Sequence, residues 1–237
     1  MVALVFKGVV FDFDGVIMDS HPAHLRAWKS FFNSVGKNVS EEQLHFVLDG
    51  RKRDDILRHF LGPLNADEIE EYGLQKEQCF RDEVTHVLVA DGLLGFLEDL
   101  ESEQFAVAIA SSGSKSRIHF LVDRFGLNKF FRVIVTGDDV EQGKPDPAVF
   151  LKAAHQLGVD PCELIAFEDA VSGIKAARSA GMRCIGIAPP DRVPILMAAG
   201  ASCVMPDFHN MSCSKIRKLL SNGAGMGSTS DSHEFMS

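Results

Sequence analysis

The sequence predicts an α/β protein with a parallel sheet as its core and an all-helical insertion after the first strand. Two observations lead to this prediction. Short apolar, β-branched segments alternate with helical patterns along most of the chain, which is typical of a parallel sheet covered by helices. Residues 20 to about 91 break this alternation, because they contain helical patterns without a convincing strand.

The predicted strands are short and apolar enough to be buried on both faces of a sheet. They span residues 9–11, 105–110, 131–135, 164–167 and 184–188. Helical patterns lie between several of them, each with a glycine near its end that suits a helix C-terminus. These patterns span residues 116–126, 147–158 and 171–182.

The insertion has its own amphipathic patterns, over residues 24–36, 40–48, 53–62 and 66–88. Leu25, Trp28, Phe31 and Phe32 are spaced to form one helix face and are expected to pack the insertion. The end of the chain is rich in small and polar residues, which predicts disorder. The predicted organisation is a core of residues 1–19 and 92–220, an insertion of residues 20–91 and a disordered tail of residues 221–237.

The composition is that of an ordinary globular protein, with 237 residues, 46% of them hydrophobic. The formal net charge of −9 offers no basic surface for nucleic acid or an anionic membrane, so an anionic substrate needs a local positive cluster. The five cysteines are scattered and contain no C-x-x-C pair, which favours a reduced compartment. No signal peptide or membrane span is recognisable, so we expect a cytoplasmic protein without an evident protein partner.

Two carboxylates stand at the end of the first predicted strand, in the stretch VVFDFDG. If the strand continued, Asp12 and Asp14 would share one face and Phe11 and Phe13 the other. A sheet covered on both sides cannot bury two unpaired charges, so the strand is expected to end here, before a turn at Gly15. Ligands bind at this carboxyl edge in open α/β sheets. The alternative is a solvated pair of loop carboxylates, whereas a calcium loop fits the spacing poorly.

Three other predicted strands also end in polar residues. Ser111 follows one strand, Lys144 lies in the loop after another, and Glu168 with Asp169 follows a third. Each has a plain alternative: Ser111 as a helix cap, Lys144 as a solvated lysine, and the acidic pair as a favourable helix N-terminus. In a parallel sheet, however, all these strand ends converge on one edge.

Four carboxylates at one edge would repel each other strongly without a cation among them, and hard oxygen ligands suit Mg²⁺. A metal ion, a lysine, a hydroxyl group and backbone donors around one carboxylate are the groups needed to hold a phosphoryl group in transfer. Asp12 then becomes the candidate nucleophile.

The ordered set of motifs resembles the haloacid dehalogenase superfamily over nearly the whole chain. The matching residues are D-x-D-G at 12–15, Ser111 after a strand, K-P at 144–145 and E-D at 168–169. The sequence is especially similar to the β-phosphoglucomutase-like branch, in which a small helical cap of the C1 type is inserted into a Rossmann-like core. The resemblance implies that residues 20–91 are this cap.

By this resemblance, Asp12 attacks the phosphorus and becomes a phosphoaspartate, while Asp14 protonates the leaving oxygen and later deprotonates the incoming water or hydroxyl. A carboxylate near like charges tends to have a raised pKa, so Asp14 is expected to be able to hold a proton. The resemblance also implies Mg²⁺ ligands: the Asp12 side chain, the Asp14 backbone carbonyl, Asp169 and, directly or through water, Glu168. It implies that the phosphoryl oxygens are bound by Ser111, the backbone of Ser112 and Lys144.

The insertion carries candidate substrate-binding residues. His24 and Trp28 are four residues apart and share a helix face, where packing is the simpler interpretation. The resemblance assigns these two residues, and the pair Gly50 and Arg53, to positions that contact substrate in related enzymes. The stretch GRKR at 50–53 also supplies the positive cluster that the net charge requires, unless it is a solvated basic turn.

The resemblance implies a Mg²⁺-dependent phosphatase that acts on small phosphorylated metabolites such as sugar phosphates. β-Phosphoglucomutase is the alternative, but the loop after Ser111 does not clearly reproduce the mutase residues that bind the second phosphate, since its lysine, Lys115, is displaced. A non-catalytic protein that only binds a phosphorylated metabolite is less favoured, because such a site has no use for a second aspartate that transfers protons.

Overall fold

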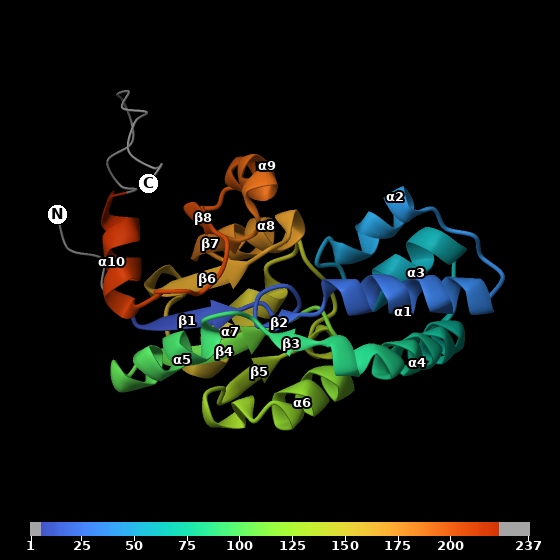
Figure 1. Cartoon of the computed structure of the whole chain (residues 1–237), viewed down its shortest axis with the longest axis horizontal. Coiled ribbons are helices and arrows are strands. Elements are labelled where there is room, and N and C mark those ends of the chain that lie inside the picture. The colour runs from blue at the N-terminus through green and yellow to red at the C-terminus, as the bar shows by residue number, and fades with distance from the viewer. Residues whose placement is uncertain (1–5, 223–237) are drawn as a thin grey trace.

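A six-stranded parallel sheet forms the centre of the protein (Figure 1). The computed structural model describes residues 6–222. The strands lie in the order β5 (Val133–Val135), β4 (Ala106–Ala110), β1 (Gly8–Phe11), β6 (Leu164–Glu168), β7 (Arg183–Ile187) and β8 (Cys203–Met205). Strand β1 pairs in parallel with both β4 and β6, so its carboxyl end lies in the middle of one sheet edge.

Helices cover both faces of this sheet. Val9 and Phe11 of β1 pack into one hydrophobic cluster and Val10 into another, as strand alternation requires. The first cluster includes residues of α5 (Leu93–Ser102), α6 (Lys115–Arg124) and α10 (Cys213–Asn222). The second includes residues of α7 (Ala148–Leu157), α8 (Val171–Ser179) and α9 (Val193–Ala198). The predicted α/β class and parallel sheet are confirmed.

The four helices α1 to α4 form a separate group beside the sheet, at the right of Figure 1. They are α1 (His21–Ser34), α2 (Glu41–Leu44), α3 (Arg53–Leu61) and α4 (Ala66–Glu83). Capping boxes at Ser40 and Asn65 start α2 and α4, because each side chain accepts a hydrogen bond from the backbone three residues later. Trp28, Phe31 and Phe32 lie in the buried cluster of this group, and Leu25 packs against it.

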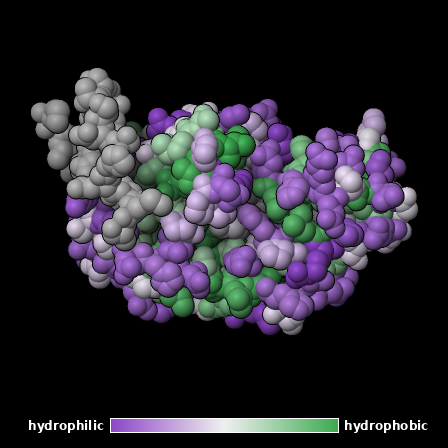
Figure 2. Space-filling view, turned by 45° about the horizontal axis from the view of Figure 1, so that its top comes forward, coloured by the Kyte–Doolittle hydropathy of each residue, from purple (hydrophilic) through white to green (hydrophobic). Residues whose placement is uncertain are grey.

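Short 3₁₀ turns complete the described part of the chain, at His45–Leu48, Val84–His86, Leu127–Lys129, Gly137–Asp139, Pro161–Glu163 and Pro190–Arg192. Within residues 6–222, no helix is both long and apolar enough to cross a membrane. Hydrophilic residues cover much of the visible surface, especially over the helical group (Figure 2).

The structure differs from the sequence prediction at three places. Strand β8 was not predicted, because it has three half-buried residues at the edge of the sheet. The second difference is a two-residue antiparallel pair of β2 (Met18–Asp19) and β3 (Leu88–Val89), where the chain enters and leaves the helical group. Residues 20–91 therefore do contain a short strand. The tail predicted from residue 221 begins inside α10, which ends at Asn222, and the rest of it lies outside the described residues.

Candidate active site

Asp12 lies directly after the last residue of β1, where the strand was predicted to end. Its backbone N–H donates to the carbonyl of Phe167 on the neighbouring strand, so Asp12 is held by the sheet although it is not part of it. Gly15 then adopts a φ of +80°, which glycine tolerates better than other residues, and the chain turns away. This turn keeps both carboxylates at the sheet edge.

Lys144 joins two of the predicted motifs at this edge. Its Nζ lies 2.5 Å from Asp12 Oδ1 and 2.6 Å from Glu168 Oε1, and it also donates to the carbonyl of Ala110. Burial lowers the pKa of Lys144, but the carboxylates of Asp12 and Glu168 outweigh this effect and hold the pKa above its ordinary value. Lys144 is therefore a buried cation and not the solvated loop lysine that was the alternative.

Asp12 lies in a crowded acidic environment. Burial raises its pKa, Lys144 opposes this, and the nearby Glu168 and Asp169 raise it further, so the pKa of the Asp12 carboxyl lies well above its usual range. Oxygen atoms of Asp12, Glu168 and Asp169 all lie within 4.8 Å of one another. Such a group of carboxylates is costly to bury, and Lys144 compensates two of the three.

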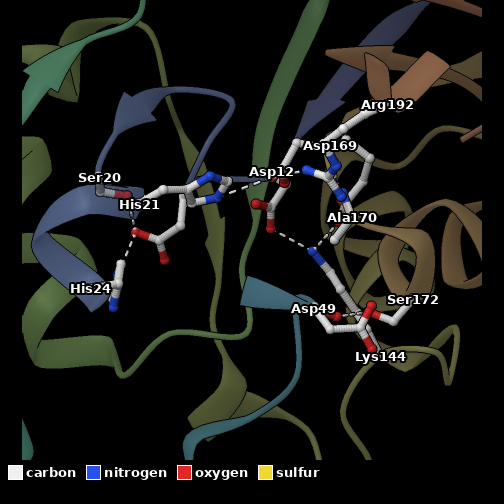
Figure 3. Close-up of polar contacts among 12 residues, drawn as sticks. Asp12, Ser20, His21, His24, Asp49, Lys144, Asp169, Ala170, Ser172 and Arg192 are labelled. Atoms are coloured by element: carbon white, nitrogen blue, oxygen red, sulfur yellow. Dashed lines mark hydrogen bonds and ion pairs between the residues drawn. The ribbon is translucent and has the colours of Figure 1, made fainter. Parts of the chain in front are cut away.

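The buried Oδ2 of Asp169 fits a divalent metal ion. Asp169 Oδ2 is buried and accepts no well-oriented hydrogen bond from the described residues, although His21 Nε2 lies 3.0 Å away and Arg192 Nη1 lies 4.0 Å away. Figure 3 shows His21 and Arg192 reaching Asp169 while Lys144 reaches Asp12. Glu168 is less free, because Lys144 and the N–H groups of Asp169 and Ala170 occupy its oxygens. Carboxylate oxygens of this kind suit Mg²⁺.

The loop after β4 serves two purposes. Ser111 is buried, and its hydroxyl accepts a hydrogen bond from the N–H of Gly113, which shapes the loop close to Asp12. Ser112 was predicted to contribute its backbone, and its hydroxyl also donates to the carbonyl of Gly50 at 2.6 Å. Ser112 thus connects the core to the helical group. Lys115 lies apart from the other cationic groups of the site, with Nζ 4.0 Å from Asp139 Oδ1.

Asp14 differs from its predicted state. Its Oδ1 accepts hydrogen bonds from Ser20 and Arg117, Oδ2 accepts a second bond from Arg117, and His24 Nε2 lies 3.0 Å from Oδ1. Burial raises the pKa of Asp14, but Arg117 and His24 together outweigh it and hold the pKa well below its ordinary value. The expectation of a raised pKa was therefore wrong: Asp14 faces a guanidinium more closely than it faces other carboxylates.

The helical group contributes His24 and Lys76 to the site. Burial lowers the pKa of His24 to about 4 and that of Lys76 to about 8. Lys76 Nζ lies 3.4 Å from His24 Nδ1 and 5.2 Å from the Trp28 ring centroid. Trp28 also stacks on Phe32, so it both packs the helical group and lines the site.

Gly50 and Arg53 lie at the other wall of the site. Gly50 has a φ of +67°, and a Cβ there would lie 3.0 Å from Ser172 Oγ, so the loop approaches the core closely. Arg53 pairs with Asp54 and packs over Gly73 of α4, where a Cβ would lie 2.6 Å from the guanidinium carbon. The basic stretch at 50–53 does not form one cluster: Arg51 and Arg53 line the site, whereas Lys52 does not line it and donates to carbonyls of residues 140 and 141.

The core and the helical group enclose a cavity of about 580 Å³, including its open mouth. Most of the predicted site residues line it, namely Asp12, Asp14, His24, Trp28, Gly50, Arg53, Ser111, Ser112 and Asp169. Sequence reasoning missed four further charged or titratable lining residues, which are His21, Lys76, Glu77 and Arg117. They stand outside the motifs, and a polar residue on an otherwise amphipathic helix gives no signal of its own.

Comparison with known proteins finds relatives that are named phosphatases. The sequence model of the haloacid dehalogenase-like hydrolase family matches residues 9–187. A phosphorylated carbohydrates phosphatase of Thermotoga maritima is 31% identical over 85% of this chain and 95% of its own length. A fructose-1-phosphate phosphatase of Escherichia coli is 31% identical over 77% of this chain and 96% of its own. The structure of a putative β-phosphoglucomutase from Bacteroides vulgatus superposes with a TM-score of 0.75 at 26% identity, covering 94% of this chain and 91% of that one.

Proposed function

Because the chain belongs to the haloacid dehalogenase-like hydrolase family, we propose that it is a Mg²⁺-dependent phosphatase that hydrolyses small phosphorylated metabolites, sugar phosphates in particular, through a phosphoaspartate. The observation that carries this proposal is the convergence of Asp12, Lys144 and Asp169 on one edge of the sheet. We also propose that residues 20–91 act as a cap over a core of residues 1–19 and 92–220. The cavity between the two parts supports this division.

In the first step, an oxygen of Asp12 attacks the phosphorus, and the bond between phosphorus and the sugar oxygen breaks. A proton from Asp14 neutralises the sugar oxygen as it leaves. In the second step, water attacks the phosphorus of the phosphoaspartate and gives a proton to Asp14, which releases inorganic phosphate and restores both aspartates. Asp14 is ionised in the substrate-free structure, which is the form needed for the second step. It must therefore take up a proton, from water or from a singly protonated phosphate ester, before the first step.

Positive charge around Asp12 makes the first step feasible. Lys144 lies against the nucleophile and offsets the charge of an arriving phosphoryl group. Mg²⁺, when held by Asp12, Asp169 and the backbone carbonyl of Asp14, supplies further positive charge beside the phosphoryl oxygens. Ser111 and the backbone of Ser112 line the same cavity and would orient these oxygens.

The names of the two relatives support a phosphorylated carbohydrate as the substrate. The cavity wall from the helical group includes the cationic side chains of Arg51 and Arg53, which suit the hydroxyl groups of a sugar. Hydrolysis is favoured over mutase activity because Lys115, the lysine of the loop after β4, lies near Asp139 and does not line the cavity.

The test measures phosphate release from a panel of sugar phosphates, including fructose 1-phosphate, with and without Mg²⁺. We expect release that requires Mg²⁺ and disappears in Asp12→Asn, whereas Asp191→Asn, an exposed aspartate outside this cavity, should leave it unchanged. Mg²⁺-dependent activity retained by Asp12→Asn would refute the mechanism. A second assay supplies β-glucose 1-phosphate together with a trace of glucose bisphosphate. Formation of glucose 6-phosphate without release of free phosphate would instead identify a mutase.

A further inference from the structure

Arg117 is the closest cationic partner of Asp14, although it lies outside every motif. It comes from the core helix α6 and donates two hydrogen bonds of 2.8 Å, one to each oxygen of Asp14. This paired arrangement fixes the plane of the carboxylate as well as its position. Gly113 makes room for it, since a Cβ at that residue would lie 2.2 Å from Arg117 Nη2.

The same guanidinium also contacts the helical group. Its Nε lies 3.8 Å from Glu77 Oε2, and its Cζ lies 5.1 Å from the centroid of the Phe80 ring, both on helix α4. The side chain is buried, with 6% of its surface exposed, so these contacts are made away from bulk water. Arg117 Nε has no hydrogen-bond partner among the described residues. This N–H could therefore donate to Glu77 if a movement of α4 brought the carboxylate closer.

We propose that Arg117 is a positioning residue for Asp14, which holds its carboxylate in one orientation and makes that orientation depend on the place of helix α4. The inference rests on the proposed function, because Asp14 needs an orientation only if it transfers a proton. Both oxygens of Asp14 are engaged by Arg117 in the substrate-free structure. The guanidinium therefore decides where the Asp14 carboxylate lies relative to the leaving oxygen, and a shift of Glu77 and Phe80 with helix α4 would move Arg117, and this orientation, with them.

Two kinds of phosphate ester separate this role from a general structural one. The alkoxide of a sugar is a poor leaving group and needs a proton from Asp14, whereas 4-nitrophenolate leaves without one. The value of kcat/KM covers the steps up to the first phosphoryl transfer. Misplacement of Asp14 should therefore lower kcat/KM for fructose 1-phosphate far more than for 4-nitrophenyl phosphate.

For Arg117→Met we expect kcat/KM to fall roughly 30-fold for fructose 1-phosphate and less than about threefold for 4-nitrophenyl phosphate. The larger loss stays below the roughly 10²- to 10⁴-fold contribution of general acid catalysis, because Asp14 itself remains. Arg117→Lys keeps the charge and one donor and should recover part of the loss. Arg124→Met, on the exposed end of the same helix, is the matched control and should change neither value. Circular dichroism checks that each variant is folded, and Arg117→Lys carries the test if Arg117→Met does not fold.

The connection to α4 is tested with Glu77→Gln and with the double variant that combines Glu77→Gln and Arg117→Met. If Glu77 acts through Arg117, the effects of the two substitutions on the ratio of the two kcat/KM values will not add. Equal losses on both esters, no loss in Arg117→Met, or additive effects in the double variant would overturn the inference while leaving the proposed function intact. Inactivity of the unmodified enzyme on both esters would overturn the proposed function, and this inference with it.

Discussion

The ammonium group of Lys144 lies 2.5 Å from Asp12, a residue 132 positions earlier in the chain. Both side chains are buried at the carboxyl edge of the sheet, and Lys144 also contacts Glu168 at 2.6 Å. One lysine thus compensates two buried carboxylates. In the proposed mechanism the pair connects stability with catalysis, because the lysine that stabilises buried Asp12 is also the one that would attract a phosphoryl group.

Lys144→Met should destabilise the protein by about 3–5 kcal/mol at pH 7.5, because it leaves two buried carboxylates without their cation. Urea denaturation followed by circular dichroism measures the change. Lys37→Met, at an exposed position, is the control and should stay within about 0.5 kcal/mol of the unmodified protein. A loss below about 1 kcal/mol for Lys144→Met would show that the two carboxylates do not depend on this lysine.

Mg²⁺ should raise the melting temperature by roughly 5–10 °C when its concentration is about 100 times its Kd, since it binds the folded state. Asp169→Asn should abolish most of this rise, because Asp169 supplies a buried carboxylate oxygen to the group formed with Asp12 and Glu168. Glu70→Gln, an exposed change on α4, should preserve it. Differential scanning calorimetry with and without Mg²⁺ measures both. An unchanged rise in Asp169→Asn would place the metal elsewhere.

Lys76→Met should stabilise the protein at pH 7 by about 1–3 kcal/mol. The pKa of Lys76 falls to about 8 in the folded state because it is buried, so keeping it charged costs free energy below pH 8. Between about pH 8 and its unfolded pKa near 10.5, the unfolded state binds more protons and the unmodified protein gains stability as the pH rises. The advantage of methionine should therefore shrink over this range.

Urea denaturation of Lys76→Met and the unmodified protein at several pH values measures this difference. The other charged or titratable groups close to Lys76 are common to both proteins, namely His24, Glu77, Arg117, Asp14 and Arg53. Lys37→Met again serves as the exposed control, for which no pH-dependent difference is expected. A Lys76→Met protein that is less stable at pH 7, by the same amount at every pH, would contradict the prediction.

Asp14→Asn should reduce steady-state turnover by about 10²-fold or more, because the attacking water loses its base. With 4-nitrophenyl phosphate, whose leaving group needs no proton, Asp12 should still accept a phosphoryl group. Stopped-flow absorbance should then show a burst of about one 4-nitrophenolate per enzyme, followed by slow turnover. Asp19→Asn, on the exposed side of β2, should turn over normally. Neither a burst nor turnover would mean that Asp14 is also required for the first step.

Local patterns were sufficient for most of the fold. The apolar segments at 9–11, 105–110 and 164–167 became the central strands β1, β4 and β6, because a strand buried on both faces has a distinctive composition. Strand β8 and the β2–β3 pair escaped prediction because short, half-buried strands have no such composition. Their existence depends on the neighbour with which they pair.

The sequence by itself determined the order of the motifs and the sheet edge to which they belong, because the carboxyl ends of parallel strands meet there whatever their separation along the chain. Only the tertiary structure decided the partners of each charge. Arg117 lies against Asp14 and turns the expected rise of its pKa into a fall. Ser112 of the core donates to the carbonyl of Gly50 in the helical group. Periodicity along a chain encodes which side chains are buried, whereas electrostatic interactions depend on distances in space, which arise only when the elements pack.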